Sequence, residues 1–174
     1  MVTELTQTEL VTRAWDAAAT VPDPELPMLT VADLGILREV SIDEGHVVVY
    51  LTPTYSGCPA MAEMRRDVAA RLAAAGFADV EVRTALSPPW STDLISADGR
   101  RKLAAAGLAP PRSLTSRETG GPVPLTLFAS GPPVACPQCG SADTTVTAAF
   151  SGTACKDLRR CHACGEPFEH VKEV

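Results

Sequence analysis

The chain opens with an amphipathic segment whose apolar positions recur every three to four residues. Thr6 and Glu9 have the spacing of a capping box, in which each side chain binds the backbone of the other. The apolar stripe that follows consists of Leu10, Ala14 and Ala18. We therefore predict a helix over residues 7–19. Prolines at positions 22, 24 and 27 end this helix and favour an extended segment.

In the next part of the chain, segments whose apolar residues alternate as in a strand are interspersed with segments whose apolar residues recur as in a helix. Residues 36–42, 46–52 and 79–84 predict strands, and the first two are joined by a turn in which Gly45 takes a positive φ. A second helix is predicted from Pro59 to a C-cap at Gly76, and a third, capped by Ser96, ends at Gly107. The fold class expected for residues 1–107 is a compact α/β (α+β) domain with a small mixed sheet and flanking helices.

Residues 108–133 interrupt this pattern with prolines and glycines, and we predict a linker or extended arm there. Within it, residues 125–128 could form an edge strand or dock on a neighbouring part of the chain. The remaining residues, 134–174, form a tail close to the size below which a domain needs a metal or cross-links.

The tail contains two Cys-x-x-Cys-Gly units. They are Cys136-Pro137-Gln138-Cys139-Gly140 and Cys161-His162-Ala163-Cys164-Gly165. Two residues between thiolates bend the backbone around one ion, and two such units give a tetrahedral S₄ site, which suits zinc and also iron. We predict a zinc-ribbon-like module with a structural zinc. A redox dithiol pair, an iron–sulfur site and a transient metal store remain alternatives, and Cys155 is left unassigned.

Composition and charge narrow the function. The 174 residues are 45% apolar and 21% charged, with a net charge of −6. Residues 1–111 carry all of this excess, so a nucleic-acid partner is disfavoured. A local patch of Lys156, Arg159 and Arg160, with the aromatic residues Phe150 and Phe168, could still contact a nucleic acid or an acidic partner. The polar N-terminus and the lack of an apolar stretch of about 18 residues predict a cytoplasmic protein without a membrane partner.

A cysteine outside the tail is the candidate for function. Cys58 follows Gly57 between a strand and the second helix, where a helix N-terminus would lower the pKa of the thiol. A small buried cysteine at a tight turn is equally compatible with the pattern. Asp23 and Glu25 stand on a stiff proline segment, where they could bind metal or anchor a turn.

Short motifs in a fixed order resemble a known family. The motifs are Asp23-Pro24-Glu25-Leu26-Pro27, Asp33-Leu34-Gly35-Ile36, Thr52-Pro53-Thr54 and Gly57-Cys58-Pro59. They resemble the iron–sulfur assembly family that includes SufT-like proteins. Further stretches resemble its phenylacetate-degradation branch, the PaaD family: Ser87-Pro88-Pro89-Trp90-Ser91-Thr92-Asp93, Gly99-Arg100-Arg101-Lys102-Leu103, and the end of the cysteine tail, Cys164-Gly165-Glu166-Pro167-Phe168.

The resemblance implies an accessory role without independent catalysis. The chain would help the iron–sulfur or di-iron centres of the multicomponent phenylacetyl-CoA epoxidase mature, with the iron–sulfur reductase as its partner. Cys58, Asp23 and Glu25 would hold iron or a cluster transiently, or contact the client. The tail ligands would be Cys136, Cys139, Cys161 and Cys164. The alternative is a structural subunit or adaptor of the oxygenase complex that transfers no metal.

Overall fold

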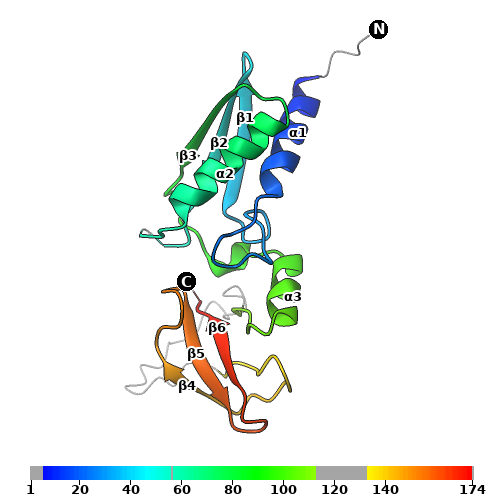
Figure 1. Cartoon of the computed structure of the whole chain (residues 1–174). Helices are drawn as coiled ribbons and strands as arrows, with labels where there is room; N and C mark the ends of the chain where they lie inside the picture. The colour runs from blue at the N-terminus through cyan, green and yellow to red at the C-terminus, as the bar shows by residue number, and fades with distance from the viewer. Residues whose placement is uncertain (1–5, 56, 113–132, 174) are drawn as a thin grey trace, which may run out of the picture. The chain divides into compact units, whose positions relative to one another are not determined.

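The computed structural model of the chain describes residues 6–55, 57–112 and 133–173 (Figure 1). Residues 125–128 and most of the expected linker lie outside these ranges. The chain divides into two compact units between Gly99 and Arg100, whereas the sequence pattern suggests a boundary at residue 107. The first unit therefore ends inside the third helix, α3 (Ala97–Ala105).

Helix α1 spans Gln7–Ala19, as the sequence predicts. The Glu9 carboxylate accepts a hydrogen bond from the Thr6 backbone N–H at 2.7 Å, and the Thr6 hydroxyl accepts one from the Glu9 N–H at 3.3 Å. Both halves of the capping box are therefore present. After the helix, Pro22 pairs with Thr30 in an isolated bridge that closes the proline-rich segment into a compact loop.

The sheet of the first unit has the order β1-β2-β3, with β1 at Leu37–Asp43, β2 at His46–Leu51 and β3 at Asp79–Thr84. β1 and β2 are antiparallel, whereas β2 and β3 are parallel and joined through α2 (Met61–Ala74). Asp43 pairs with His46, so the hairpin loop is only Glu44 and Gly45, with φ of 46° and 86°. A two-residue loop of this kind needs a positive φ at both positions, which the sequence anticipated only for the glycine.

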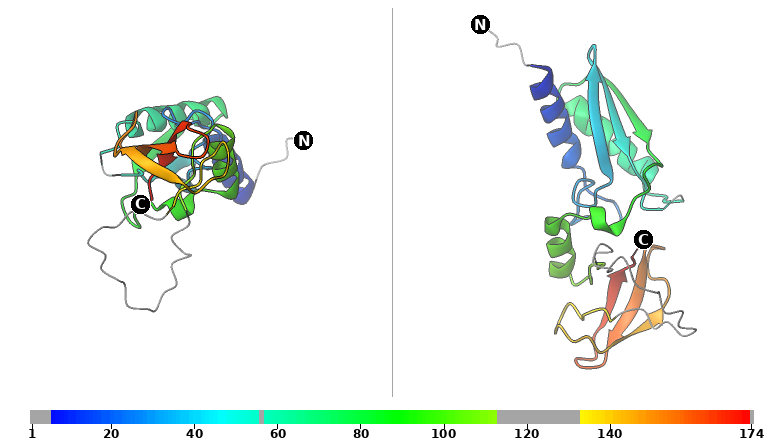
Figure 2. Two further views of the ribbon diagram at one scale, coloured as in Figure 1. Left: turned by 90° about the horizontal axis from the view of Figure 1, so that it is seen from below. Right: turned by 180° about the vertical axis from the view of Figure 1, so that it is seen from behind.

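Both long helices pack on one face of this sheet, and the other face carries no helix (Figure 2). The core between them is built from the inward positions of every element. Its fully buried members include Ala14, Ala18, Val47, Val49, Leu51, Met64, Val68 and Leu72. The apolar side chains of the strands, which recur every two residues, therefore pack against those of the helices, which recur every three to four, as predicted.

The segment after β3 returns to the loop that precedes β1. The Trp90 indole N–H donates to the Leu34 carbonyl at 2.8 Å, and the Ser96 N–H donates to the Asp33 carbonyl at 2.9 Å. A Cβ on Gly35, whose φ is +67°, would lie 2.5 Å from the Leu94 carbonyl oxygen. The Asp33-Leu34-Gly35 motif thus packs against the segment from Trp90 to the start of α3 and accepts hydrogen bonds from it.

The second unit is a three-stranded antiparallel sheet of order β4-β5-β6. Its strands are β4 (Thr144–Ala148), β5 (Lys156–Cys161) and β6 (Pro167–Val171). Ala109 forms a parallel bridge to His170, with its N–H 2.8 Å from the Glu169 carbonyl. This part of the expected arm therefore belongs to the second unit. The buried apolar cluster of this sheet is small: Ala109, Val134, Cys136, Cys161 and Phe168.

The observed division sharpens the charge asymmetry. Residues 1–99 contain 6 arginines against 15 carboxylates, a net of −9, whereas residues 100–174 contain 9 basic and 6 acidic side chains, a net of +3. The first unit is therefore strongly acidic and the second is basic rather than neutral. Within the described ranges, no helix is both long enough and apolar enough to cross a membrane.

Candidate functional site

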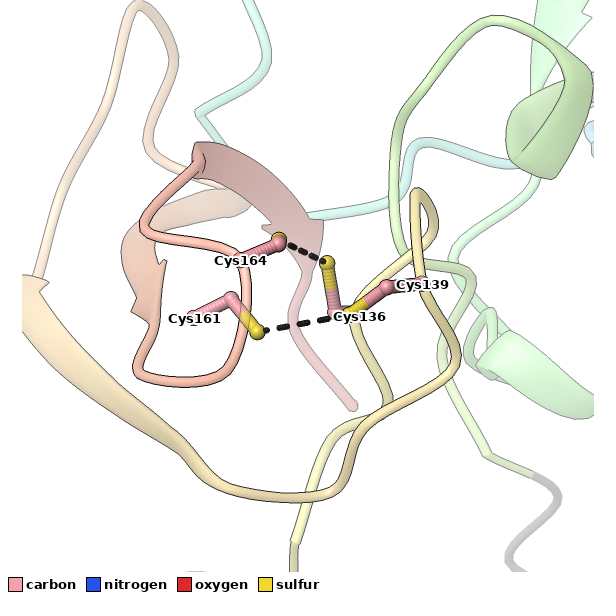
Figure 3. A group of neighbouring side chains, drawn as sticks. All are labelled: Cys136, Cys139, Cys161 and Cys164. Atoms are coloured by element: carbon pink, nitrogen blue, oxygen red, sulfur yellow. Dashed lines mark hydrogen bonds between the residues drawn. The ribbon is translucent and has the colours of Figure 1, made fainter.

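The four cysteines of the two Cys-x-x-Cys-Gly units meet at one point in the second unit (Figure 3). Their sulfur atoms all lie within 4.8 Å of one another. The Sγ atoms of Cys136 and Cys164 are 3.7 Å apart, and those of Cys139 and Cys161 are 3.6 Å apart. A tetrahedral ion with metal–sulfur bonds of about 2.3 Å requires sulfur separations of about 3.8 Å, so the donor set fits such an ion.

The two units are knuckles of the same construction. The Gly140 N–H donates to the Cys136 carbonyl at 2.8 Å, and the Gly165 N–H donates to the Cys161 carbonyl at 3.0 Å. Both glycines have a left-handed φ, 75° and 79°, which glycine adopts without steric cost. The turn leaves backbone N–H groups directed at the sulfurs, where they stabilise thiolates.

The electrostatics of the cluster suit a cation at its centre. The pKa of the Cys161 thiol is lowered to about 7, first because the Cys164 N–H donates a hydrogen bond to its sulfur. A hydrogen bond from the Glu166 N–H acts in the same direction on Cys164, but burial and the neighbouring thiols raise the pKa of Cys164 to about 12. Four thiolates this close repel one another, and a cation at their centre would offset that repulsion, so the electrostatics agree with the geometry in favouring a metal-binding site.

Two other candidate ligands of the tail lie elsewhere. The Cys155 sulfur is 3.1 Å from the Thr153 hydroxyl, and it is not among the residues that converge at the metal site. His170 is buried, and its Nδ1 lies 3.3 Å from the Asp157 carboxylate on the adjacent strand. This pair was not predicted from the sequence, although cross-strand pairing on one sheet face could have suggested it.

The basic patch considered for nucleic acid is largely neutralised. Lys156 is buried and its Nζ lies 2.7 Å from the Glu169 carboxylate, while Arg159 Nε lies 3.1 Å from the Asp157 carboxylate. Phe168, one of the two aromatic residues expected on this surface, is buried in the core of the unit. The other, Phe150, is exposed, with Lys172 Nζ 4.2 Å from the centre of its ring. These contacts give the cluster a role in holding the ribbon together.

Cys58 lies in the loop between β2 and α2 of the first unit. Helix α2 begins at Met61 and not at Pro59, so Cys58 precedes the N-cap residue, Ala60, instead of forming the cap. The Cys58 N–H donates to the Tyr55 carbonyl at 3.2 Å, and the Cys58 carbonyl accepts from the Met61 N–H at 3.4 Å. Because β2 and β3 are parallel, this loop emerges at the same edge of the sheet as the segment after β3.

The pKa of the Cys58 thiol is raised above its ordinary value of 9.0. Burial is the largest cause, and the negative charges of Glu25 and Asp23 act in the same direction. Hydrogen bonds from the N–H groups of Ala60 and Met61 oppose the rise without cancelling it. The lowered pKa expected from the sequence is therefore wrong: helix N–H groups do reach the sulfur, but burial and two carboxylates outweigh them.

The structure brings Asp23 and Glu25 into the electrostatic neighbourhood of Cys58, but the three do not form a preassembled ligand set. Asp23 is buried, and its Oδ1 accepts hydrogen bonds from the N–H groups of Glu25 and Leu26, each at 2.8 Å. Asp23 therefore anchors the proline-rich turn. Glu25 is half-buried. Among the described residues, the tail cysteines are the group close enough to hold one ion together.

Comparison with known proteins agrees with both units. Residues 12–84 match the model of the iron–sulfur cluster assembly protein family, and residues 121–172 match the PaaD zinc beta ribbon domain. A crystal structure of a domain of unknown function, DUF59, from Bacillus anthracis superposes with a TM-score of 0.53 at 28% identity, covering 56% of this chain and 93% of that one.

Two curated relatives extend the match. SufT of Staphylococcus aureus (strain USA300), an Fe-S protein maturation auxiliary factor, is 37% identical over 44% of this chain and 88% of its own length. A putative subunit of the 1,2-phenylacetyl-CoA epoxidase of Escherichia coli (strain K12) is 39% identical over 91% of this chain and 90% of its own length.

Fold and site together define an iron–sulfur-assembly domain followed by a metal-binding zinc ribbon. Because the match to the Escherichia coli protein spans both units, the chain belongs to the PaaD family. The resemblance of its sequence motifs is thereby confirmed.

Proposed function

We propose that this chain is a cytoplasmic maturation factor for the iron–sulfur or di-iron centres of a phenylacetyl-CoA epoxidase, acting on the iron–sulfur reductase component. The observation that carries the proposal is the position of Cys58 beside Asp23 and Glu25 in a domain of the iron–sulfur assembly family. The proposal is supported by two relatives, one named as an epoxidase subunit and the other as a maturation factor.

The electrostatics of Cys58 suit transient binding of an iron cargo. A thiol must lose its proton to bind a metal, and a raised pKa means that the proton competes more strongly with the ion. The charges of Asp23 and Glu25 that disfavour the thiolate attract a cation to the same place. Iron therefore binds as the thiol proton leaves, and it departs readily when a client offers a stronger ligand set.

The tail has a structural role in this proposal. Cys136, Cys139, Cys161 and Cys164 hold one zinc ion, which organises a sheet whose own apolar cluster is small. Four thiolates close the coordination sphere and leave no position for a substrate. The metal of the tail therefore supports the fold, and transfer chemistry is assigned to Cys58.

The experiment compares Cys58→Ser with Cys155→Ser, a matched change at another half-buried thiol outside the metal cluster. Each variant is expressed in cells that lack this chain but contain the epoxidase components. Iron and acid-labile sulfide are then measured in the purified reductase. We expect Cys58→Ser to lower the cluster content severalfold and Cys155→Ser to leave it at the wild-type level. Equal cluster content with both variants would show that Cys58 is not needed for maturation of the reductase cluster.

A second candidate function follows from the name of the Escherichia coli relative, which calls it an epoxidase subunit. In that case the chain is a structural subunit or adaptor of the oxygenase complex and transfers no metal. It would copurify at a fixed ratio with active oxygenase, and the reductase would contain a full cluster in cells without this chain. The same cluster measurement in cells that lack this chain therefore separates the two candidates.

A further inference from the structure

The uncovered face of the first sheet carries three cross-strand rows of side chains, which we call the open face. Register places them as Asp43–His46–Asp79, Ser41–Val48–Glu81 and Glu39–Tyr50–Arg83, each row running from β1 through β2 to β3. Each of these side chains is exposed or half-buried, whereas the alternate positions Val40, Val47, Val49 and Val82 are buried on the helix side. No helix of the first unit covers the open face (Figure 2).

The open face has an ordered charge network on its β2–β3 side. His46 Nδ1 lies 2.9 Å from the Asp79 carboxylate and its Nε2 lies 3.5 Å from the Glu81 carboxylate. Arg83 pairs with Glu81 at 2.6 Å and also donates to the Tyr50 hydroxyl at 3.2 Å. These contacts fix the orientation of the side chains, so the face presents a defined pattern.

The remaining carboxylates of this region are uncompensated. Glu39, Asp43 and the adjacent turn residue Glu44 form no ion pair with any residue in the described part of the chain. Counting Asp79 and Glu81 against Arg83, the open face and its turn have a net charge of −4 when His46 is neutral. The exposed side of α2, by contrast, mixes Glu63 and Asp67 with three arginines. Much of the acidic excess of the first unit is therefore gathered on one flat surface.

We propose that the open face docks a lysine- and arginine-rich protein surface of the client; this inference rests on the maturation role proposed above. The centre of the face holds Val48 and Tyr50, and charged groups surround them, which is the usual anatomy of a protein interface. The carboxylates are spread across three strands and do not converge on a single point, so an extended cationic surface fits better than a metal ion. Nucleic acids and anionic membranes would be repelled.

The dimensions of the face set the expected strength of the contact. Three strands spaced about 4.8 Å apart and rising about 3.3 Å per residue give a platform of a few hundred Å². That is less than the roughly 800 Å² per partner of a stable interface, so binding should be weak, fast and sensitive to salt. A transient contact of this kind suits a factor that must leave its client after maturation.

The test uses the full-length chain and the purified iron–sulfur reductase as the probe. Glu39→Lys/Asp43→Lys reverses two carboxylates that form no ion pair with any described residue, and Glu63→Lys/Asp67→Lys makes the same change of net charge on α2. We expect the open-face variant to weaken binding at least tenfold at 50 mM NaCl, and the α2 variant to weaken it less than threefold. Wild-type binding should also weaken as NaCl is raised to 200 mM. Thermal unfolding of both variants checks that the first unit remains folded.

Three results would overturn the inference. The first is an equal loss of reductase binding in the two double variants, and the second is no loss of binding in either. The third is no measurable binding of the wild-type chain to the reductase. A change in the sedimentation of the chain alone, with reductase binding intact, would assign the face to self-association and would also overturn it. The cluster content of the reductase in cells tests the maturation role separately. Full restoration of that content by the open-face variant, in cells where Cys58→Ser fails, would reject the docking surface and leave the maturation role standing.

Discussion

The two units use cysteine in opposite ways. In the second unit four sulfurs lie within 4.8 Å of one another and two knuckles direct backbone N–H groups at them. In the first unit Cys58 stands beside two carboxylates in a partly buried loop, and its pKa is raised. The first arrangement holds four ligands in place for one metal ion, whereas the second makes the thiolate form of the cysteine less favourable. These differences match the roles proposed for the two units, in which the second keeps its metal and Cys58 of the first exchanges one.

The largest expected effect is loss of the metal of the second unit. Cys136→Ser removes one of four ligands, and structural zinc contributes on the order of 10 kcal/mol to domains of this kind. We expect the variant to lose the single zinc proposed for the tail and the dispersed amide signals of residues 133–173, while the signals of the first unit persist. Metal analysis and two-dimensional NMR measure both changes.

The control for this prediction is Cys155→Ser, which should retain about one zinc per chain and a folded ribbon. Acid-labile sulfide should be absent from the wild-type chain and from both variants. Sulfide at a stoichiometric level would contradict the assignment of the tail to a structural zinc.

The next effect tests whether the first unit can unfold while the second unit stays folded. Gly35→Ala would place a Cβ 2.5 Å from the Leu94 carbonyl at a φ of +67°, so we expect it to lower the free energy of unfolding of the first unit by about 3 kcal/mol. Gly76→Ala has a similar strain, φ +95°, but no atom within 4 Å, and should cost about 1 kcal/mol. Denaturant unfolding followed by the fluorescence of Trp15 and Trp90, which both lie in the first unit, measures the difference. Zinc content should be unchanged in both variants, and its loss in Gly35→Ala would show that the units do not fold independently.

A smaller effect concerns the reactivity of Cys58. Its thiol should be alkylated by iodoacetamide slowly at pH 8, because burial and the charges of Glu25 and Asp23 keep it protonated. Glu25→Gln removes one negative charge, lowers the pKa of Cys58 and should increase the alkylation rate severalfold at this pH. Glu63→Gln on α2 removes the same charge elsewhere and serves as the control. Mass spectrometry of the Cys58 peptide over pH 7–10 gives the rate, and identical profiles for the two variants would exclude the effect of Glu25.

The smallest effect is the titration of His46 on the open face. Its hydrogen bond to Asp79 is the main cause that raises the pKa above the ordinary value of about 6.5. Because the folded state binds the proton more tightly, this stabilisation is fully present below pH 6.5 and is lost as the pH rises through the folded-state pKa. NMR titration of the imidazole should show a raised pKa that falls in Asp79→Asn. An unchanged pKa in that variant would contradict the contact.

The sequence predicted local structure well where one pattern dominates. The capping box at Thr6 gave α1 with its observed bounds, and alternation gave β3 at Asp79–Thr84. The start of α2 was placed too early, because proline at position 59 suits a first helical turn, whereas the chain instead turns between Tyr55 and Cys58 and begins the helix at Met61. The pairing of Ala109 with β6 was not predicted, because no local pattern encodes a contact between segments so far apart in the chain.

By itself, the sequence determined most elements of the first unit, the four cysteines that converge and the family, because caps, periodicity and cysteine spacing are local properties. Only the tertiary structure decided whether the pKa of the Cys58 thiol is raised or lowered. Burial and the approach of Glu25 and Asp23 from a distant loop reversed the shift that the neighbouring helix alone would produce. Register likewise gathered carboxylates from three strands onto one open face. Electrostatic effects of this kind depend on which segments meet in space, and that is fixed only when the chain has folded.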